Sequence, residues 1–151
     1  MAESSITAKD IMTEKPVILE SSTPILEAVN IFIQRKFTSV PVMTTMGDVA
    51  GQLTEAILLR ALVLHQLQPT KFKILNDCLD MMEKIVYVSS EATVPTIIQA
   101  VYKSPTRRVL VKNDGRTILG IISPKDLLDL LLKGNAEAEA VRNEINKLKA
   151  S

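Results

Sequence analysis

The chain has 151 residues, of which 46% are hydrophobic, enough apolar material for one domain or two small ones with real cores. Its 18 basic and 17 acidic side chains nearly cancel, and aromatic residues make up only 3%. This composition excludes the basic face and the stacking platforms that nucleic-acid binding needs. A single cysteine, Cys78, excludes an internal disulfide framework and indicates a reducing, cytoplasmic location. No apolar run approaches the ~18 residues of a membrane-spanning helix, so we expect no membrane insertion.

The first half of the chain predicts a short approach helix, three strands and two longer helices. Prolines limit these elements because proline ends a helix and fits its first turn. In the longer helices the apolar residues recur at helical spacing, whereas the strands are short β-type runs. The predicted elements are, in order, a helix over 6–12, a break over 13–16, a strand over 17–19, a helix after Pro24, a strand over 39–43, a turn over 44–48, a strand over 49–53, and a helix that starts after Thr54 and ends before Pro69.

The second half predicts the same order of elements. Its hairpin tip, Asn113-Asp114-Gly115, has the residue types of a tight turn, and Lys133-Gly134 has those of a helix end. The predicted elements are an approach helix over 73–82, a strand over 85–88, cap residues over 89–95, a helix with its apolar face at 97–101, a strand over 108–111, a strand over 117–122, and a helix over 126–132.

The stretch Gly120–Leu127 reads as a strand, a sharp stop and a helix start. Ser123 can cap the helix, Pro124 fits its first turn, and Asp126 stands three residues after the cap, where an acid suits both the capping box and the helix dipole. Such an octet opens many helices and by itself is structural. However, the chain has a matching stretch 69 residues earlier, where Thr54 takes the place of Ser123.

A repeated unit of about 70 residues is too small to cover both faces of its own three-stranded sheet. We therefore expect an α+β fold in which two β-α-β-β-α repeats, residues 6–68 and 72–133, pack as a pseudo-twofold pair with clefts between them. The remainder, residues 134–151, is charged, and Val141, Ile145 and Leu148 fall on one helical stripe. This tail predicts a helix that docks on its own module, a second chain or a client, or else a frayed end.

The chain resembles a tandem pair of CBS domains, the family named after cystathionine β-synthase, a pair also called a Bateman module. The resemblance covers residues 6–133 and rests on the order and recurrence of short motifs rather than on one of them. They are Asp10-Ile11-Met12-Thr13, Val40-Pro41-Val42 and Gly51-x-Leu53-Thr54 in the first repeat, and Asp80-Met81-Met82, 108–111, 113–115 and 120–127 in the second.

The resemblance implies regulation by ligand binding rather than catalysis. Modules of this family hold AMP, ADP, ATP or S-adenosylmethionine in the clefts between repeats and control an attached enzyme, channel or transporter. Because the resemblance covers nearly the whole chain, we expect control of an unknown client in trans, with the module as a homodimer. No cofactor is required by this interpretation.

The family pattern, carried over position by position, implies a nucleotide site around Ser123 and Asp126. Asp126 would accept hydrogen bonds from the ribose hydroxyls, and arginines before the second strand would bind phosphate. Without the family resemblance, these arginines would be interpreted as solvent-exposed residues at the start of a strand. The apolar residues of the expected base slot can equally be core. The implied site comprises Ser123, Asp126, Lys125, Ile121, Arg107, Arg108, Lys84, Ile85, Val86, Val109, Thr38 and Ser39.

The first repeat departs from the family pattern because Ile57 stands where the acid belongs. Isoleucine cannot bind a diol, so we expect the second cleft, with Thr54, Val17 and Ile18, to be empty, weaker or occupied in another way. One of the two arginines is expected to point into that cleft. A further departure is Leu110 at the position of Pro41.

Other residues offer little chemistry. His65 lies in a helical run of leucines, and no second histidine is present to activate Cys78. Met12, Met81 and Met82 recur at matching places and fit adaptable packing better than a metal site. The sequence also has no phosphate-binding glycine motif. We therefore predict neither an enzyme nor a metal protein.

Two hypotheses remain. Ser123, Asp126 and the arginines favour a ligand sensor that binds an adenosyl compound and alters its partner contacts. Ile57 and Leu110 favour a ligand-independent dimeric scaffold or accessory module whose clefts have decayed.

Overall fold

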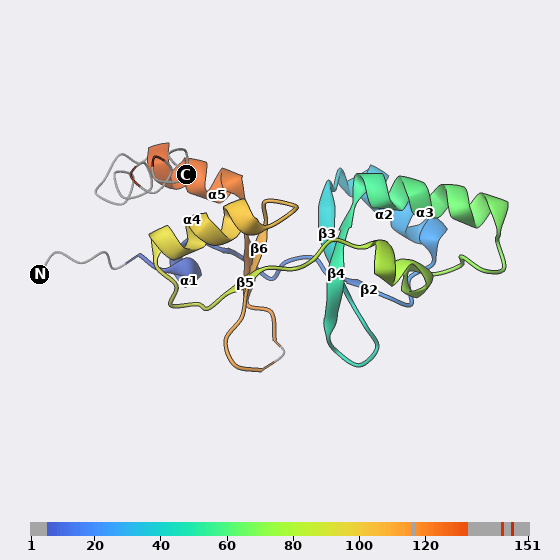
Figure 1. Cartoon of the computed structure of the whole chain (residues 1–151), viewed down its shortest axis with the longest axis horizontal. Coiled ribbons are helices and arrows are strands. Elements are labelled where there is room, and N and C mark those ends of the chain that lie inside the picture. Colours follow the sequence, from blue (N-terminus) through green and yellow to red (C-terminus); the bar gives the residue numbers. More distant parts are fainter. Residues whose placement is uncertain (1–5, 116, 133–142, 144–145, 147–151) are drawn as a thin grey trace, which may run out of the picture. The chain divides into compact units, whose positions relative to one another are not determined.

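The computed structural model describes residues 6–115, 117–132, 143 and 146, which form an α+β fold in two compact units (Figure 1). The first unit is the continuous stretch Val17–Ile85. The second unit combines the N-terminal segment up to Pro16 with the chain from Val86 onward. The α+β fold class and the two repeats predicted from the sequence are confirmed.

In the first unit, a three-stranded sheet carries helices on one face. The strands are β2 (Leu19–Glu20), β3 (Ser39–Met43) and β4 (Val49–Thr54), with β3 central, parallel to β2 and antiparallel to β4. Helices α2 (Ile25–Arg35), α3 (Glu55–Leu67) and the 3-10 helix η1 (Leu75–Met81) supply the rest of the core. The core contains Leu19, Ile25, Ala28, Phe32, Val40, Val42, Leu53, Leu58, Ala61, Leu75 and Cys78.

The second unit has a four-stranded sheet in the order β1-β7-β6-β5. Its strands are β1 (Thr13–Glu14), β5 (Tyr87–Val88), β6 (Val109–Val111) and β7 (Gly120–Ile122). Helices α1 (Ala8–Ile11), α4 (Val94–Lys103) and α5 (Pro124–Leu132) all contribute to its core. Because side chains alternate along a strand, Val109, Val111 and Ile122 enter this core, whereas Leu110 and Ile121 point to the opposite face.

The two approach segments are exchanged between the repeats. Residues 13–14, predicted only as a break, form β1 and pair with β7, and the Ala8 N–H donates to the Ala92 carbonyl at 3.0 Å. In the first unit, Gln52 and Glu83 exchange backbone hydrogen bonds of 2.8 and 3.0 Å. Each compact unit therefore combines most of one sequence repeat with the approach segment of the other repeat.

Several predicted elements are shorter or tighter than the sequence indicates. In place of the strands predicted over 17–19 and 85–88, the structure has the two-residue strands β2 and β5. Each lies at the edge of its sheet and pairs with a single neighbouring strand. The approach helix predicted over 73–82 is the 3-10 helix η1. Among the described residues, no helix has both the length and the apolar character needed to cross a bilayer. The predicted tail, 134–151, lies outside the described residues except for 143 and 146, which are helical and exposed.

Two glycines allow the exchanged segments to approach the sheets. A Cβ on Gly120 would stand 2.5 Å from the Met12 sulfur and 2.8 Å from the Thr13 carbonyl oxygen. A Cβ on Gly51 would stand 2.8 Å from the Met82 Cβ and 2.9 Å from the Glu83 carbonyl oxygen. In both places the obstacle includes backbone, which cannot rotate away as a side chain can.

We predict that Gly120→Ala destabilises the protein by about 1–3 kcal/mol, because the added methyl group overpacks the contact with β1. Urea unfolding of the variant and the wild type measures this difference. The double variant Gly120→Ala/Met12→Ala is the control: it removes the side-chain clash but keeps the backbone clash, so it should recover only part of the loss. Full recovery would show that Met12 alone requires the glycine.

Asp77 caps the start of η1. Its Oδ2 accepts hydrogen bonds from the backbone N–H groups of Ile74 at 3.1 Å and Lys73 at 2.9 Å. These bonds hold the pKa of Asp77 below its ordinary value of 3.8. A carboxylate with a lowered pKa in the folded state stabilises that state above the pKa of the unfolded chain, and this contribution is lost as the pH falls.

We expect Asp77→Asn to lower the free energy of unfolding at neutral pH, because the amide is a weaker acceptor than the carboxylate. The gap between wild type and variant should close as the pH falls below about 4, where the carboxylate becomes protonated in both states. Thermal melts over a pH series measure the gap. A difference that stayed constant down to about pH 2 would mean that the cap charge contributes nothing.

Candidate functional site

The junction between β7 and α5 is built as the sequence predicts. The Ser123 N–H donates to Asp126 Oδ2 at 2.8 Å, and the Ser123 hydroxyl donates to the same oxygen at 3.2 Å. In return the Asp126 N–H donates to the Ser123 carbonyl at 3.0 Å. The capping box is confirmed, and both residues are half-buried. Its bonds fix the orientation of the carboxylate and use only Oδ2.

The N-terminal segment adds a second acid to this junction. Asp126 lines a small cavity of about 100 Å³ together with Asp10 and Ile11 of α1 and Asp129 and Leu130 of α5. Asp10 forms a capping box of its own, accepting the Thr7 N–H at 2.8 Å. Among the described residues, no group of three acidic, histidine or cysteine side chains is placed to hold a metal ion. The sequence did not reveal this cavity because Asp10 reaches it through the exchange of segments.

At the matching junction of the first unit, between β4 and α3, the hydroxyl is kept but the acid is missing. The Thr54 hydroxyl oxygen accepts the Ile57 N–H at 3.2 Å and so caps α3. Ile57 is half-buried and packs against the first-unit core. This junction therefore has a capped helix without a carboxylate at the position that matches Asp126.

The two arginines lie at the end of the β6–β7 ladder nearest Ser123. The last antiparallel pair, Val109 with Ile122, places Arg108 and Ser123 at the same end of the sheet. Arg108 Nη1 donates to the Thr106 carbonyl at 3.2 Å. Arg107 has a left-handed backbone, with φ at 59°, and its guanidinium bonds to the Tyr102 carbonyl and lies over the Tyr102 ring. Both guanidinium groups thus contact residues a few positions earlier in the chain, Tyr102 near the end of α4 and Thr106 in the loop that follows.

The residues predicted to line the base slot do not all lie on one side of the sheet. Some belong to the core, and others lie on the opposite face. Val109 is buried in the second-unit core and Val86 packs against that core. Ile121 is half-buried on the opposite face, and Lys125 is exposed in the first turn of α5. Ile121 is the member of this group that the fold leaves facing away from the core.

The remaining predicted residues belong to the first unit. Thr38 is exposed and its carbonyl accepts the Glu55 N–H at 3.2 Å, while Ser39 pairs with Thr54 across β3 and β4. The Ser39 hydroxyl oxygen is buried without a hydrogen-bond partner in the described structure. Lys84 is exposed, and Ile85, Val17 and Ile18 are half-buried. It remains a prediction that the ligand of Ser123 is also contacted by Thr38, Ser39, Lys84 and Ile85.

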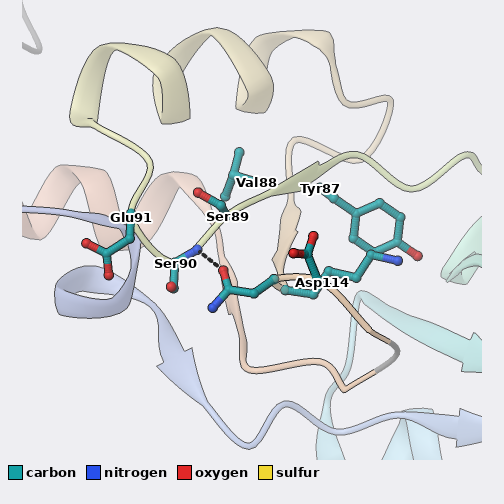
Figure 2. Close-up of a pocket in the computed structure, with 8 residues that line it drawn as sticks. Tyr87, Val88, Ser89, Ser90, Glu91 and Asp114 are labelled. Atoms are coloured by element: carbon teal, nitrogen blue, oxygen red, sulfur yellow. Dashed lines mark hydrogen bonds between the residues drawn. The ribbon is translucent and has the colours of Figure 1, made fainter.

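A second hollow in the second unit was not predicted from the sequence. It is an open groove of about 510 Å³ where the parallel strands β5 and β6 end, lined by residues 87–91 and 112–114 (Figure 2). The Asn113 side-chain oxygen accepts the Ser90 N–H at 2.9 Å, and the Lys112 ammonium lies 4.1 Å from the centre of the Tyr87 ring. The sequence showed Asn113 only as a turn residue, because its bond to Ser90 joins residues 23 positions apart.

The profile of the CBS domain matches residues 8–64 and 75–133 of the chain. The chain belongs to the CBS domain family. Protein MJ1426 of Methanocaldococcus jannaschii is 19% identical, over 82% of this chain and 90% of the relative. The γ-3 subunit of the pig (Sus scrofa) 5′-AMP-activated protein kinase is 25% identical over 83% of this chain, which spans only 25% of that subunit.

Solved CBS structures have the same fold. CBSX2 of Arabidopsis thaliana, solved with AMP, has a TM-score of 0.70 at 19% identity, covering 85% of this chain and 98% of CBSX2. The CBS domain pair of MJ0100, solved with 5′-methylthioadenosine and S-adenosyl-L-methionine, has a TM-score of 0.63 at 22% identity, covering 86% and 98%. The chain is therefore a tandem CBS pair, as its repeats predicted.

Proposed function

We propose that this CBS pair is a regulatory module that binds an adenine nucleotide or adenosyl ligand at the β7–α5 junction and signals to a protein client in trans. The observation that carries the proposal is the oriented Ser123–Asp126 pair, whose capping bonds use one carboxylate oxygen. AMP, ADP, ATP and S-adenosylmethionine are the candidate ligands. The proposal is supported by the AMP complex of CBSX2 and the adenosyl complexes of MJ0100.

The chemistry of the junction suits a ribose. An ionised carboxylate can accept hydrogen bonds from both hydroxyls of a cis-diol, and charge-assisted bonds of this kind contribute ~1.5–3 kcal/mol each. The N-terminal end of α5 adds outward N–H groups and a positive dipole end. Arg107 and Arg108, at the same end of the sheet, are the candidate partners for phosphate, and Ile121 is the candidate contact for the base.

A second function is favoured by two other residues. Ile57 stands in the first repeat at the position of Asp126, and Leu110 stands in the second repeat at the position of Pro41. Both changes fit a ligand-independent dimeric scaffold or accessory module. Under either function we propose a homodimer that acts in the cytoplasm without catalysis, membrane insertion or nucleic-acid binding.

Calorimetric titration separates the two functions. With AMP, ADP, ATP, S-adenosylmethionine and GMP as the guanine control, the sensor predicts saturable binding of one adenine ligand per chain. A site with a Kd of ~10 μM should also raise the stability by about 2.7 kcal/mol at millimolar ligand. Absence of heat and of any melting shift would favour the scaffold.

The asymmetry between the repeats predicts that Asp126→Ala weakens adenine binding by roughly 10- to 100-fold or more, whereas Ile57→Ala hardly affects it. Calorimetry measures both affinities. Asp77→Ala is the matched control, because it removes a helix-capping carboxylate whose side chain does not line the Asp126 cavity. Equal losses in Asp126→Ala and Ile57→Ala, or in Asp126→Ala and Asp77→Ala, would contradict a single site at Asp126.

A further inference from the structure

The parallel strands of the two units part at different places. In the first unit the last parallel pair is Glu20 with Met43, and the Ser21 N–H continues the ladder by donating to the Met43 carbonyl at 2.8 Å. The matching positions of the second unit lie 69 residues later, and there the pairing of β5 with β6 ends one step sooner, at Val88 and Val111. The open groove of about 510 Å³ begins where the strands have parted.

At this groove a side chain replaces the next bond of the ladder. The Ser90 N–H stands at the position of the Ser21 N–H, yet it donates to the Asn113 side-chain oxygen at 2.9 Å instead of to the Lys112 carbonyl. The Lys112 carbonyl is thereby left without the donor that its counterpart in the first unit, the Met43 carbonyl, has. A hydrogen bond between residues 23 positions apart therefore joins the two strand ends across the groove and leaves a backbone acceptor beside it.

Ser90 also brings a buried hydroxyl group to the groove. The residue lines the groove and is only 7% exposed, and its hydroxyl makes no hydrogen bond within the described part of the chain. By contrast, the buried Ser104 hydroxyl of the same unit donates to the Arg108 carbonyl at 2.7 Å. Figure 2 shows the Ser90 side chain directed away from Val88, which belongs to the core. Because an unbonded buried hydroxyl costs free energy, this group is expected to bind a polar molecule in the groove.

The charged groups around the groove leave one carboxylate uncompensated. The Glu91 carboxylate pairs with the Lys9 ammonium at 3.2 Å, and the Lys112 ammonium lies 4.1 Å from the centre of the Tyr87 ring. Asp114 lines the groove, is exposed, and makes no ion pair with any described residue. Figure 2 shows its carboxylate directed from the β6–β7 hairpin toward β5. A free carboxylate near a carbonyl and a hydroxyl favours a ligand that is positively charged and donates hydrogen bonds.

We propose that this groove is a further ligand site, which takes a small organic ammonium compound. The ammonium pairs with the Asp114 carboxylate, and neighbouring N–H or O–H groups of the ligand donate to the Ser90 hydroxyl and the Lys112 carbonyl. The volume falls within the roughly 300–1,000 Å³ of small-molecule sites, and ligands of open α/β sheets bind beyond the carboxyl ends of parallel strands. The groove lies at the end of β6 opposite to Arg108, so the inference does not rest on the proposed nucleotide site.

Backbone amide NMR shifts of the full chain test the site, because they detect millimolar affinities and locate the bound ligand. The probe is putrescine, a linear diamine, and the matched control ligand is 1,4-butanediol, in which hydroxyl groups replace both ammonium groups. The variants are Asp114→Asn, Ser90→Ala and Asp80→Asn. Asp80 is the control position, because it is an exposed acid on η1 that does not line the groove. Thermal melts report whether each variant folds, and asparagine at position 114 keeps a residue type that suits a tight turn.

We expect putrescine to shift the amide signals of residues 88–91 and 112–114 saturably, and 1,4-butanediol to leave them nearly unchanged. Asp114→Asn should raise the dissociation constant of putrescine roughly 10-fold, because a charge-assisted bond is lost, and Ser90→Ala should raise it about 3-fold. Asp80→Asn should leave it unchanged. Ser90→Ala should also keep or slightly raise the melting temperature, because its hydroxyl has no partner to lose.

Three results would overturn the proposal. Equal shifts with 1,4-butanediol would show that the groove does not select an ammonium group. Groove signals that do not move with putrescine would exclude the site. Equal weakening in Asp114→Asn and Asp80→Asn would reduce the effect to general charge attraction. Binding of an adenine nucleotide is a separate outcome, which decides the proposed function alone.

Discussion

The arrangement of each unit depends on a close backbone contact between an exchanged segment and a glycine in a neighbouring strand, β7 in the second unit and β4 in the first. At Gly120 the neighbours are Met12 and Thr13, and at Gly51 they are Met82 and Glu83. Any side chain at these positions would push the segment away from the strand. Because β1 then could not pair with β7, α1 would lose its place against the second-unit core. The glycine thus decides whether a repeat keeps its neighbour's approach segment.

This exchange also shapes the candidate site. The Asp126 carboxylate is oriented by Ser123, but its surroundings come from α1, which brings Asp10 to the same cavity. The N-terminal segment is therefore part of the junction although it is far from Asp126 in sequence. At the first-unit junction, Thr54 performs the capping alone, and Ile57 is taken up by the core. The two junctions share a helix cap and differ in whether a carboxylate stands three residues after the capping hydroxyl.

The sequence predicted the features that depend on local patterns. The capping box at Ser123, the end of α3 before Pro69 and the hairpin strand β3 follow from residue types within a few positions of one another. The 69-residue repeat extended these local patterns to the fold class. A resemblance between motifs then supplied the family, which no single motif could have done.

The features that the sequence did not predict depend on contacts between distant residues. Two residues, Thr13 and Glu14, are too few to show the alternation of a strand, and they become β1 only by pairing with β7. Arg107 and Arg108 were expected to present their charges to phosphate, but a guanidinium also binds carbonyl oxygens and aromatic rings nearby in the chain, as both do here with Tyr102 and Thr106. Val109 shows the same limit. In the sequence, an apolar residue beside a predicted site looks the same whether it contacts a ligand or packs in the core, and Val109 packs in the core.

Helix α5 connects the candidate site to the surface of the second unit. It begins at the Ser123–Asp126 junction and carries Leu128 and Leu132, which are exposed. A ligand that forms hydrogen bonds with the first turn acts on the capping box there, and it therefore changes the stability of the helix start. At the first-unit junction Ile57 stands at the position of Asp126, so the start of α3 has no carboxylate in a capping box that a ribose could contact in this way.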